Sequence, residues 1–515
     1  MEPSWVYSSL LALYLCVLVV IAVYGVHRYQ LVYLYYKHRR NTPRQLACFR
    51  NLPKVVVQLP MYNERHVAQR IIETTCGIDY PRDRLAIQVL DDSTDETTEI
   101  AQHAVAAMRK RGHDIEYIHR TNRDGYKAGA LAAGLDRTDA EYICIFDADF
   151  VPPPDILTRT IHYFTDENIG MVQARWDHIN RDQSLLTKTQ AILLDGHFVI
   201  EHGARNRSGR FMSFNGTAGL WRASCIRDAG GWQHDTLTED LDLSYRAQMK
   251  GWRFVFLPNL VSPAELPPDI LGFKAQQHRW AKGGAQTARK LLGRILRSRL
   301  PARIKLEAFF HLTSCVGYIC IVLLTVMLFP ALYLKLHLFE DSLVGRVLFD
   351  VSLLLVATFS ASTFYACSQR EVFRTWADSV KYLPFLVSLG VGMSLNNARA
   401  ALEGFFGKPG EFVRTPKFGV TTAADDRWKA RLPGSSTRKK RSLQPYLELA
   451  MGVYLTGCLI FCLGNRQIGI GIPFLALFMV GYFYVSILSL VGDRIALAPR
   501  ADAAETQPDA LPPIP

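Results

Sequence analysis

Two hydrophobic patterns alternate along the chain: long uncharged runs, and shorter apolar runs embedded in polar sequence. The first long run covers residues 6–26 without a charge, which suits the ~30 Å hydrocarbon core of a bilayer. It has neither a basic start nor a small-residue cleavage site, and basic residues follow it, so we expect a retained anchor rather than a signal peptide. After a long charged stretch, apolar runs return at residues 308–334, 347–367, 382–395, 446–463 and 468–491.

The run at residues 382–395 is short for a membrane span. Its uninterrupted apolar part is about fourteen residues and contains Pro384, which is typical of an interfacial or re-entrant helix. Residues 403–444 are rich in Lys and Arg, and such loops stay on the cytoplasmic side. We therefore predict five spans and one interfacial helix, and the following segments: an anchor with a basic flank (1–44), a cytoplasmic domain (45–303), two spans (304–368), an interfacial helix and basic loop (369–444), two spans (445–495) and a disordered tail (496–515).

Residues 54–150 show the shorter pattern, in which strands alternate with amphipathic helices. Apolar runs at 55–59, 85–90, 115–118 and 142–146 predict strands, the first of them ended by Pro60. Apolar stripes at helical spacing lie between them, and Ser93 with Glu96 predicts a capping box at one helix start. This alternation predicts an α/β fold with a mostly parallel sheet, whose ligands bind beyond the carboxyl ends of the strands.

Composition narrows the class of protein. Of the 515 residues, 49% are hydrophobic and 21% are charged, which excludes a disordered polar chain. The 10 cysteines form no Cys-x-x-Cys pair and lie mostly in apolar runs, so we interpret them as small buried hydrophobes. The net charge of +12 is concentrated beside the apolar runs, as on the cytoplasmic flanks of membrane proteins, so we expect a bilayer and no nucleic acid as partner.

Acidic pairs stand where two of the predicted strands end. Asp91 and Asp92 follow one strand, and Asp147 and Asp149 follow another. Two neighbouring carboxylates suit Mg²⁺ or Mn²⁺ that bridges a diphosphate. An isolated Asp-x-Asp is more often a solvated turn, but two acidic strand ends in one domain repel each other unless a cation offsets them. Lys127, in a glycine-rich turn, is a candidate for phosphate contact, although a surface lysine is common in such a turn.

A third acidic pair and a cationic-aromatic segment lie further along the chain. Glu239 or Asp240 is a candidate general base for a sugar hydroxyl, and the alternative is a helix start favoured by the helix dipole. The Arg279 guanidinium can pair with a diphosphate and the Trp280 indole can stack on a sugar face. Both residues are equally typical of an amphipathic helix beside a membrane.

Other common sites are not expected. His197 and His202 are five residues apart, whereas two ligands on one α-helical face are four apart, so we expect no zinc pair. The sequence has no Gly-x-Ser-x-Gly elbow, Walker loop or dinucleotide-binding Gly-x-Gly-x-x-Gly.

Eight short motifs follow one another in the polar part of the chain: QLPMYNE (58–64), QVLDDST (88–94), DGYKAGAL (124–131), IFDADF (145–150), VQARW (172–176), FNGTAGLW (214–221), TEDL (238–241) and QQHRW (276–280). Together they resemble the motifs of membrane-embedded family 2 glycosyltransferases of the cellulose-synthase-like group, most of all the A and C proteins, which are glucomannan and glucan synthases. The resemblance covers residues 54–292 closely and the membrane region loosely. One such motif would be weak evidence for this resemblance, but eight motifs in the same order are strong evidence.

The resemblance implies a GT-A fold, a Rossmann-like α/β domain combined here with transmembrane helices, and inverting transfer from a nucleotide sugar. Asp147 and Asp149 would hold Mg²⁺ or Mn²⁺, and Asp240, beside Glu239, would be the general base. The substrate-binding residues that it implies are Asn63, Glu64, Asp91, Asp92, Lys127, Asn215, Gly216, Thr217, Gln276, Arg279, Trp280, Thr415 and Lys417.

Within that set, the resemblance assigns different parts of the substrates. Asp92 would contact the donor nucleotide. Lys127 and Arg279 would contact the diphosphate of the donor. Trp280 would stack on the acceptor, and residues 215–217 would line the acceptor's path. Residues 412–417 are similar to the gating loop that covers the nucleotide in cellulose synthases, although Arg414 departs from the Val that is usual there.

The leading hypothesis is a processive synthase in the plasma (inner) membrane that joins hexosyl units from UDP-glucose or GDP-mannose, through β-1,4 links, and passes the chain through its own spans. An alternative is transfer of a single sugar to a membrane lipid such as diacylglycerol. A third, from another class, is a non-catalytic translocation subunit, which the complete set of acidic and Arg-Trp motifs disfavours. The acceptor is therefore a glycan or a lipid, and the oligomeric state is left open.

Overall fold

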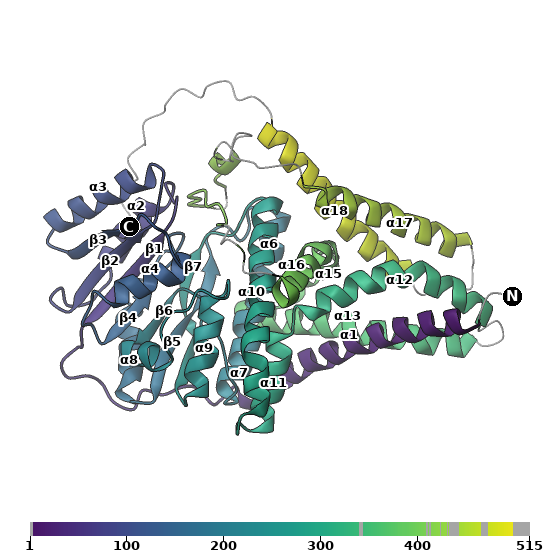
Figure 1. Ribbon diagram of the computed structural model, residues 1–515, viewed down its shortest axis with the longest axis horizontal. Helices are drawn as coiled ribbons and strands as arrows, with labels where there is room; N and C mark the ends of the chain where they lie inside the picture. Colours follow the sequence, from purple (N-terminus) through teal and green to yellow (C-terminus); the bar gives the residue numbers. More distant parts are fainter. Residues whose placement is uncertain are drawn as a thin grey trace.

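The computed structural model describes residues 4–338, 343–407, 410, 414–422, 424–429, 431, 442–464 and 472–497. An α/β domain lies on one side and a group of long helices on the other, and α6 (Leu185–Asp195), α10 (Ile270–Arg297) and α11 (Ala302–Leu312) lie between them (Figure 1). The predicted tail from residue 498 onward, the basic run at 438–441 and positions 412–413 of the gating-type loop fall outside the described residues.

Seven strands form one mixed sheet in the order β3-β2-β1-β4-β6-β5-β7. Strands β3, β2, β1 and β4 are parallel neighbours, β6 is antiparallel to both of its neighbours, and β5 pairs parallel with β7. This confirms the mostly parallel sheet that the alternating pattern predicts. The strands are β1 (Val55–Met61), β2 (Leu85–Asp91), β3 (Asp114–His119), β4 (Tyr142–Ile145), β5 (Ile169–His178), β6 (Gly219–Arg222) and β7 (Arg253–Ala264).

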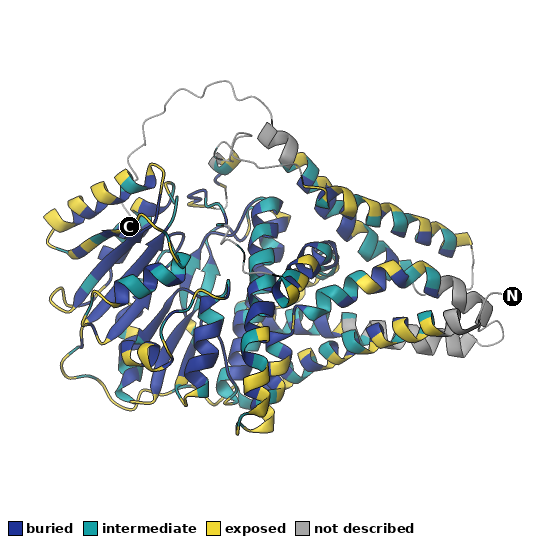
Figure 2. Cartoon of the chain, in the orientation of Figure 1, coloured by how far each residue is buried: buried dark blue, intermediate teal, exposed yellow. Residues whose placement is uncertain are grey.

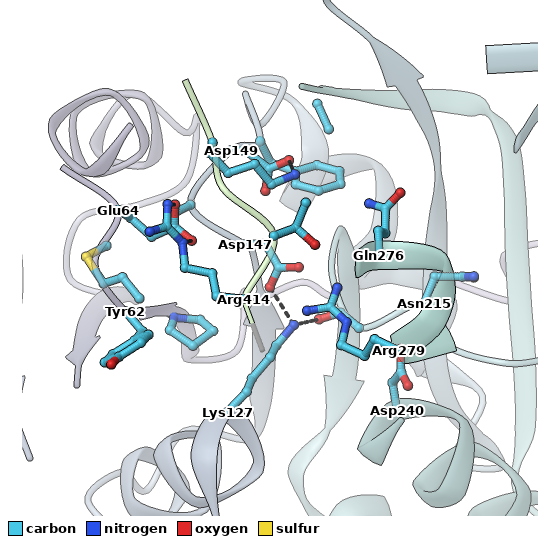
Figure 3. A pocket seen from close by; sticks show the side chains of 18 of the residues that line it. Tyr62, Glu64, Lys127, Asp147, Asp149, Asn215, Asp240, Gln276, Arg279 and Arg414 are labelled. Carbon is cyan, nitrogen blue, oxygen red and sulfur yellow. Dashed lines mark hydrogen bonds and ion pairs between the residues drawn. The ribbon is translucent and has the colours of Figure 1, made fainter. Parts of the chain in front are cut away.

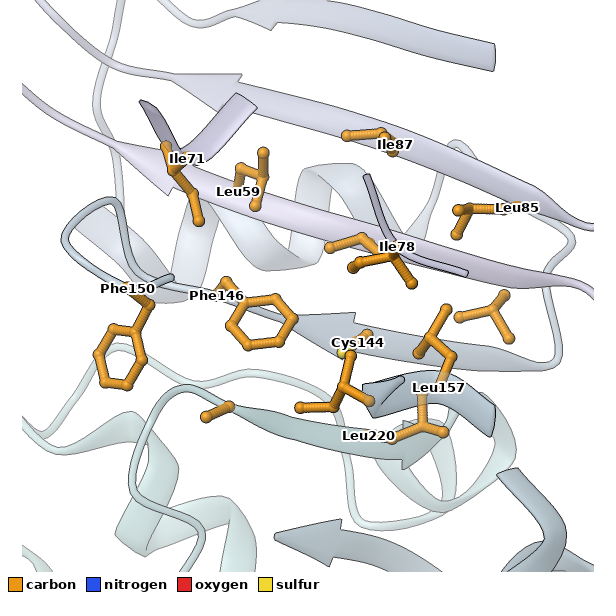
Figure 4. Close-up of a cluster of buried hydrophobic side chains, with 14 of the residues drawn as sticks. Leu59, Ile71, Ile78, Leu85, Ile87, Cys144, Phe146, Phe150, Leu157 and Leu220 are labelled. Atoms are coloured by element: carbon orange, nitrogen blue, oxygen red, sulfur yellow. The ribbon is translucent and has the colours of Figure 1, made fainter. Parts of the chain in front are cut away.

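Helices cover both faces of the sheet. Successive residues of a strand point to opposite faces, so Val57 and Leu59 of β1 pack with α2 (Ala68–Cys76), α3 (Thr97–Lys110) and α5 (Ile156–Thr160), the layer that Figure 4 shows in part. Val56 packs in the opposite layer, with α4 (Tyr126–Leu135), α8 (Ala223–Asp228) and α9 (Glu239–Met249). The side chains on both faces of the sheet are buried (Figure 2), so the polar residues that end the strands are left at the edge of the sheet.

Two local expectations about this domain differ from the structure. The strand β1 does not end at Pro60 but continues to Met61, because pairing with β4 has already ended at Gln58 and Pro60 is paired only with Leu90 of β2. The capping box is wrong as well: α3 begins at Thr97, whose amide donates to Asp95, so the predicted pair does not cap it. The Ser93 hydroxyl instead accepts from the Asn63 amide at 2.8 Å, joining the ends of β1 and β2.

The second region is helical. Three described helices are long and apolar enough to cross a membrane, within residues Ser9–His38, Gln444–Gly464 and Ile472–Gly492, and a bent pair, Ala302–Leu312 with Val316–Ala331, would make a fourth. The helices are α1 (Ser4–His38), α12 (Val316–Leu338), α13 (Leu343–Phe373), α15 (Leu383–Gly392), α16 (Ser394–Phe406), α17 (Gln444–Gly464) and α18 (Ile472–Leu497), with shorter turns η1 (Ile161–Thr165), η2 (Gly196–His202), α7 (Gly203–Arg207), α14 (Ala377–Val380) and η3 (Arg427–Lys429).

The segment expected at the interface is a broken helix. Its apolar part, α15, has 10 residues and is therefore ~15 Å long, half of a hydrocarbon core. It packs against α18, where Gly392 lies so close to Gly481 that neither position has room for a Cβ. The count of five spans, with residues 45–303 and 403–444 on the cytoplasmic side, stays a prediction.

Candidate active site

A pocket lies beyond the carboxyl ends of β1, β2 and β4, between the sheet and α10 (Figure 3). Its walls come from the turns after these strands, the first turns of α4 and α9, one face of α10, and the segment 414–417. Fourteen of the residues singled out from the sequence line it: Glu64, Asp92, Lys127, Asp147, Asp149, Asn215, Gly216, Glu239, Asp240, Gln276, Arg279, Trp280, Thr415 and Lys417. Patches distant along the chain therefore meet in one pocket.

The two carboxylates after β4 are each paired with a lysine. Lys127 Nζ donates to Asp147 Oδ1 at 2.5 Å and to the carbonyl oxygen of Gly216 at 2.9 Å. Lys417 Nζ donates to Asp149 Oδ2 at 2.6 Å. The strand directs both aspartates to the sheet edge, and the lysines offset the repulsion that two acidic strand ends would otherwise produce.

The chemistry of this pair fits a divalent cation. Both carboxylates line the same pocket, and hard oxygen donors are the ligands that Mg²⁺ and Mn²⁺ prefer. Among the described residues, no group of three or more His, Cys, Asp or Glu side chains is arranged to hold a metal. A cation here would therefore take part of its coordination from a ligand such as a diphosphate, as Mg²⁺ usually does.

The candidate base stands at the start of α9. Burial, and then the charge of Glu239, raises the pKa of Asp240 to about 7, which suits a group that accepts a proton near neutral pH. Gly216, at φ 80°, faces this carboxylate, and a Cβ there would lie 2.9 Å from Asp240 Oδ2. Because Lys127 binds both Asp147 and Gly216, the candidate base and the candidate metal ligand are connected through a single lysine.

The cationic-aromatic segment occupies one face of α10. Asp269 caps this helix, accepting from the amides of Leu271 and Gly272, each at 2.9 Å. Gln276, Arg279 and Trp280 follow at helical i, i+3 and i+4 spacing, so all three turn toward the pocket. The sequence alone allowed an amphipathic membrane helix, and the structure places these side chains against the acidic edge of the sheet instead.

Segment 414–420 crosses the pocket as a strap. Arg414 makes a two-pronged ion pair with Glu64, at 2.9 and 2.8 Å, and also donates to the carbonyl of Asn63. Glu265 accepts from the amides of Phe418 and Val420, at 2.8 and 3.1 Å. Burial raises the pKa of Glu64 to about 7, against the opposing charge of Arg414.

Sequence reasoning missed several residues around the pocket. Glu265 carries no motif, and Arg414 stood out only as a departure from the family pattern. Arg120, next to the QVLDDST turn in space, holds both oxygens of Asp92, at 2.8 and 2.5 Å. The guanidinium of Arg123 lies 3.4 Å from the centre of the Tyr62 ring, which forms a flat platform at the pocket wall.

Three expected substrate contacts lie behind the lining rather than in it. Asp91 is fully buried and accepts from the Tyr117 hydroxyl at 2.6 Å. Asn63 accepts from the Thr94 amide at 2.8 Å, and Thr217 accepts from the Asp147 amide at 2.9 Å. These side chains brace the loops that carry Asp92, Glu64 and Asp147.

Comparisons with known proteins show which family this chain resembles. The model of a family described as "Glycosyltransferase like family 2" matches residues 53–283. The chain is 35% identical over 452 residues to the probable glucomannan 4-beta-mannosyltransferase 9 of Oryza sativa subsp. japonica, covering 84% of this chain and 82% of that one. It is 34% identical over 465 residues to the glucomannan 4-beta-mannosyltransferase 2 of Arabidopsis thaliana, covering 86% and 82%.

Among solved structures, a mannosyltransferase from Pyrobaculum calidifontis in complex with GDP-Man and Mn²⁺ shares 20% identity and a TM-score of 0.50, covering 76% of this chain and 99% of that one. Likeness at that level of identity concerns the fold alone. It confirms the GT-A fold that the motifs imply.

Proposed function

Because this chain belongs to glycosyltransferase family 2, we propose that it is an inverting, metal-dependent hexosyltransferase that builds a β-1,4-linked polysaccharide processively. That it is a hexosyl-transferring enzyme follows from the family. The finer proposal rests on one observation: the carboxylate of Asp240, the Lys127–Asp147 pair and Arg279 line a single pocket.

We place the donor at the carboxyl edge of the sheet. The Tyr62–Arg123 platform would take the nucleobase, with Asp92 beside it, and Lys127 and Arg279 would neutralise the departing diphosphate. A divalent cation held by Asp147 and Asp149 would supply further positive charge to the phosphate oxygens. GDP-mannose is favoured over UDP-glucose, because the relatives named above are mannosyltransferases.

The transfer step would use the chain's own base. An acceptor hydroxyl between Gly216 and Trp280 gives its proton to Asp240, and its oxygen forms a bond to C1 of the donor sugar. The bond between C1 and the phosphate oxygen breaks on the opposite side, so the configuration inverts, and the nucleoside diphosphate leaves. A pKa near 7 allows Asp240 to be deprotonated before the step and to hold the proton after it.

Processive growth is supported by the position of Trp280 and its helix α10 beside the apolar helices. Trp280 offers a stacking surface, and α10, which carries it, packs along α16 and against α18, next to the apolar helices. A growing glycan that leaves Trp280 therefore meets the membrane region.

The test is to incubate the purified full-length protein in lipid with labelled GDP-mannose and with UDP-glucose, separately, and to size the products. A long β-1,4-linked polymer from one donor, lost in Asp240→Asn, is expected. A product that carries one sugar on a lipid would show that the protein is a glycolipid-forming transferase and not a polysaccharide synthase. If neither donor is used, the proposal is refuted.

A further inference from the structure

A π-helical turn brings together two histidines that an α-helix would separate. Element η2 (Gly196–His202) is a π-helix, with hydrogen bonds that close at a five-residue spacing. His197 and His202 therefore share one face, with ring centres 4.5 Å apart. Such turns are rare and concentrate at functional sites.

Both rings contact one side chain, Asn215 on the pocket wall. His197 Nε2 lies 2.8 Å from Asn215 Nδ2, and His202 Nε2 lies 2.5 Å from Asn215 Oδ1. His197 Nδ1 faces a carboxylate oxygen of Glu201 at 3.1 Å. Since a carboxylate only accepts, His197 carries its proton on Nδ1, its Nε2 accepts from the Asn215 amide, and His202 donates to the Asn215 oxygen.

This network fixes the amide in one orientation and leaves part of it for a ligand. An asparagine side chain has two N–H donors and two oxygen lone pairs, and the histidines use one of each. The backbone is held too, because the backbone N–H of Asn215 donates to Gln173 Oε1 at 3.1 Å. Among the described residues, the second N–H and the second lone pair of the Asn215 amide have no protein partner. They stand one residue before Gly216, which faces Asp240, and match a sugar hydroxyl, which both donates and accepts.

The π-turn is anchored on the membrane side of the molecule. Glu201 accepts from Arg205 at 3.2 Å, and Arg205 donates to Glu307 of α11 at 2.9 Å. At Gly196 a Cβ would meet Phe364 of α13 at 2.6 Å, and at Gly203 it would meet Tyr35 of α1 at 2.9 Å. The glycines on either side of the histidines therefore pack directly against two long helices, and Val199 and Ile200 of the turn belong to the same buried cluster as Tyr35 and Phe364.

We propose that His197 and His202 are positioning residues, which orient the Asn215 amide to bind hydroxyl groups of the acceptor sugar beside Asp240. The inference rests on the proposed function, since it assigns the acceptor side of the same pocket. The histidines do not touch the substrate, and their effect is on acceptor capture rather than on the donor.

The experiment measures how consumed donor divides between polymer and free sugar. The full-length protein in lipid is given labelled GDP-mannose, or UDP-glucose if only that is consumed. In His202→Leu we expect the ratio of polymer to hydrolysed sugar to fall by about five- to tenfold, as for one lost hydrogen bond. The polymer rate should account for this fall, while donor KM and the rate of donor hydrolysis should stay within about twofold of wild type, which also shows that the variant is folded.

The matched control is His202→Gln, whose amide nitrogen can replace Nε2 as donor and should restore most of the ratio. Asn215→Ala should lower the ratio as much as His202→Leu, and combining the two should add nothing. An unchanged ratio in either single variant, or a rise in donor KM together with an equal fall in polymer formation and donor hydrolysis, would overturn the positioning role. Wild-type protein that consumes no nucleotide sugar would instead refute the proposed function.

Discussion

Lys417 donates to Asp149 at 2.6 Å across 268 residues of sequence. Both side chains are nearly buried, with exposed fractions of 12% and 8%. The Lys417 ammonium group would therefore compete with a divalent cation for Asp149 under the proposed function. If Asp149 holds the cation, as proposed above, cation binding would displace Lys417 and so would be coupled to the strap 414–420.

Replacing Lys417 by Met should lower the Mn²⁺ concentration that gives half-maximal activity by about tenfold, because a hydrogen bond to a charged group contributes ~1.5 kcal/mol. Activity is titrated with Mn²⁺ after chelation with EDTA, which should abolish it in wild type. Lys429→Met, in an exposed pair with Asp426, is the control and should not change the titration. Activity that survives EDTA would remove the metal role from Asp149.

Asp240→Asn should reduce transfer by about 10²- to 10⁴-fold, the range for loss of a general base, with donor KM little changed. Initial rates at saturating donor measure it. Asp235→Asn is the matched control on the same segment: its carboxylate is 56% exposed, pairs with Lys290 at 2.6 Å and lies outside the pocket lining. Residual activity within tenfold of wild type in Asp240→Asn would assign the base elsewhere.

The pH dependence of transfer should report the buried carboxyl of Asp240. Its pKa is raised to about 7, and the base must be ionised to act, so the rate should fall as pH drops through about 7. A raised carboxyl pKa also means that folding stability is lost as pH rises, since the folded state disfavours the charged form. Asp240→Asn should therefore unfold at a higher temperature than wild type at pH 8, and an equal or lower melting temperature would contradict the assignment.

The Arg414–Glu64 pair should control how long the strap covers the pocket. Arg414→Gln and Glu64→Gln should each raise donor KM by about tenfold, and the double variant should be no worse than either, because both changes break one contact. Steady-state kinetics of the three variants measure this coupling. Additive effects of the two changes would show that each side chain contacts the donor separately.

A buried ion pair joins α10 to the apolar helix α17, with Lys274 Nζ 2.7 and 2.9 Å from the carboxylate oxygens of Glu448. Removing only one partner leaves a buried charge and should cost about 3–5 kcal/mol. Glu448→Leu should therefore lower the melting temperature in detergent, and Lys274→Met combined with it should recover most of the loss. A double variant as unstable as the single one would show that packing rather than charge is lost.

The local patterns were sufficient for the framework of the α/β domain. Periodicity predicted strands at β1 to β4 because burial on both faces demands continuous apolar runs, and the acidic residues after β2 and β4 had to emerge at one edge because the strands are parallel. The capping box failed because Ser93 forms a longer-range contact with Asn63 that competes with the helix start.

The amino-acid sequence by itself determined the family, the sheet edge with its carboxylates, and the apolar runs that suit a membrane. These are properties of short segments, set by residue spacing and by the separation of polar from apolar side chains. Tertiary structure decided that Arg414 and Lys417 bind Glu64 and Asp149, and that a π-turn puts His197 and His202 on Asn215. Contacts between segments so far apart depend on how whole helices pack, which no local spacing encodes.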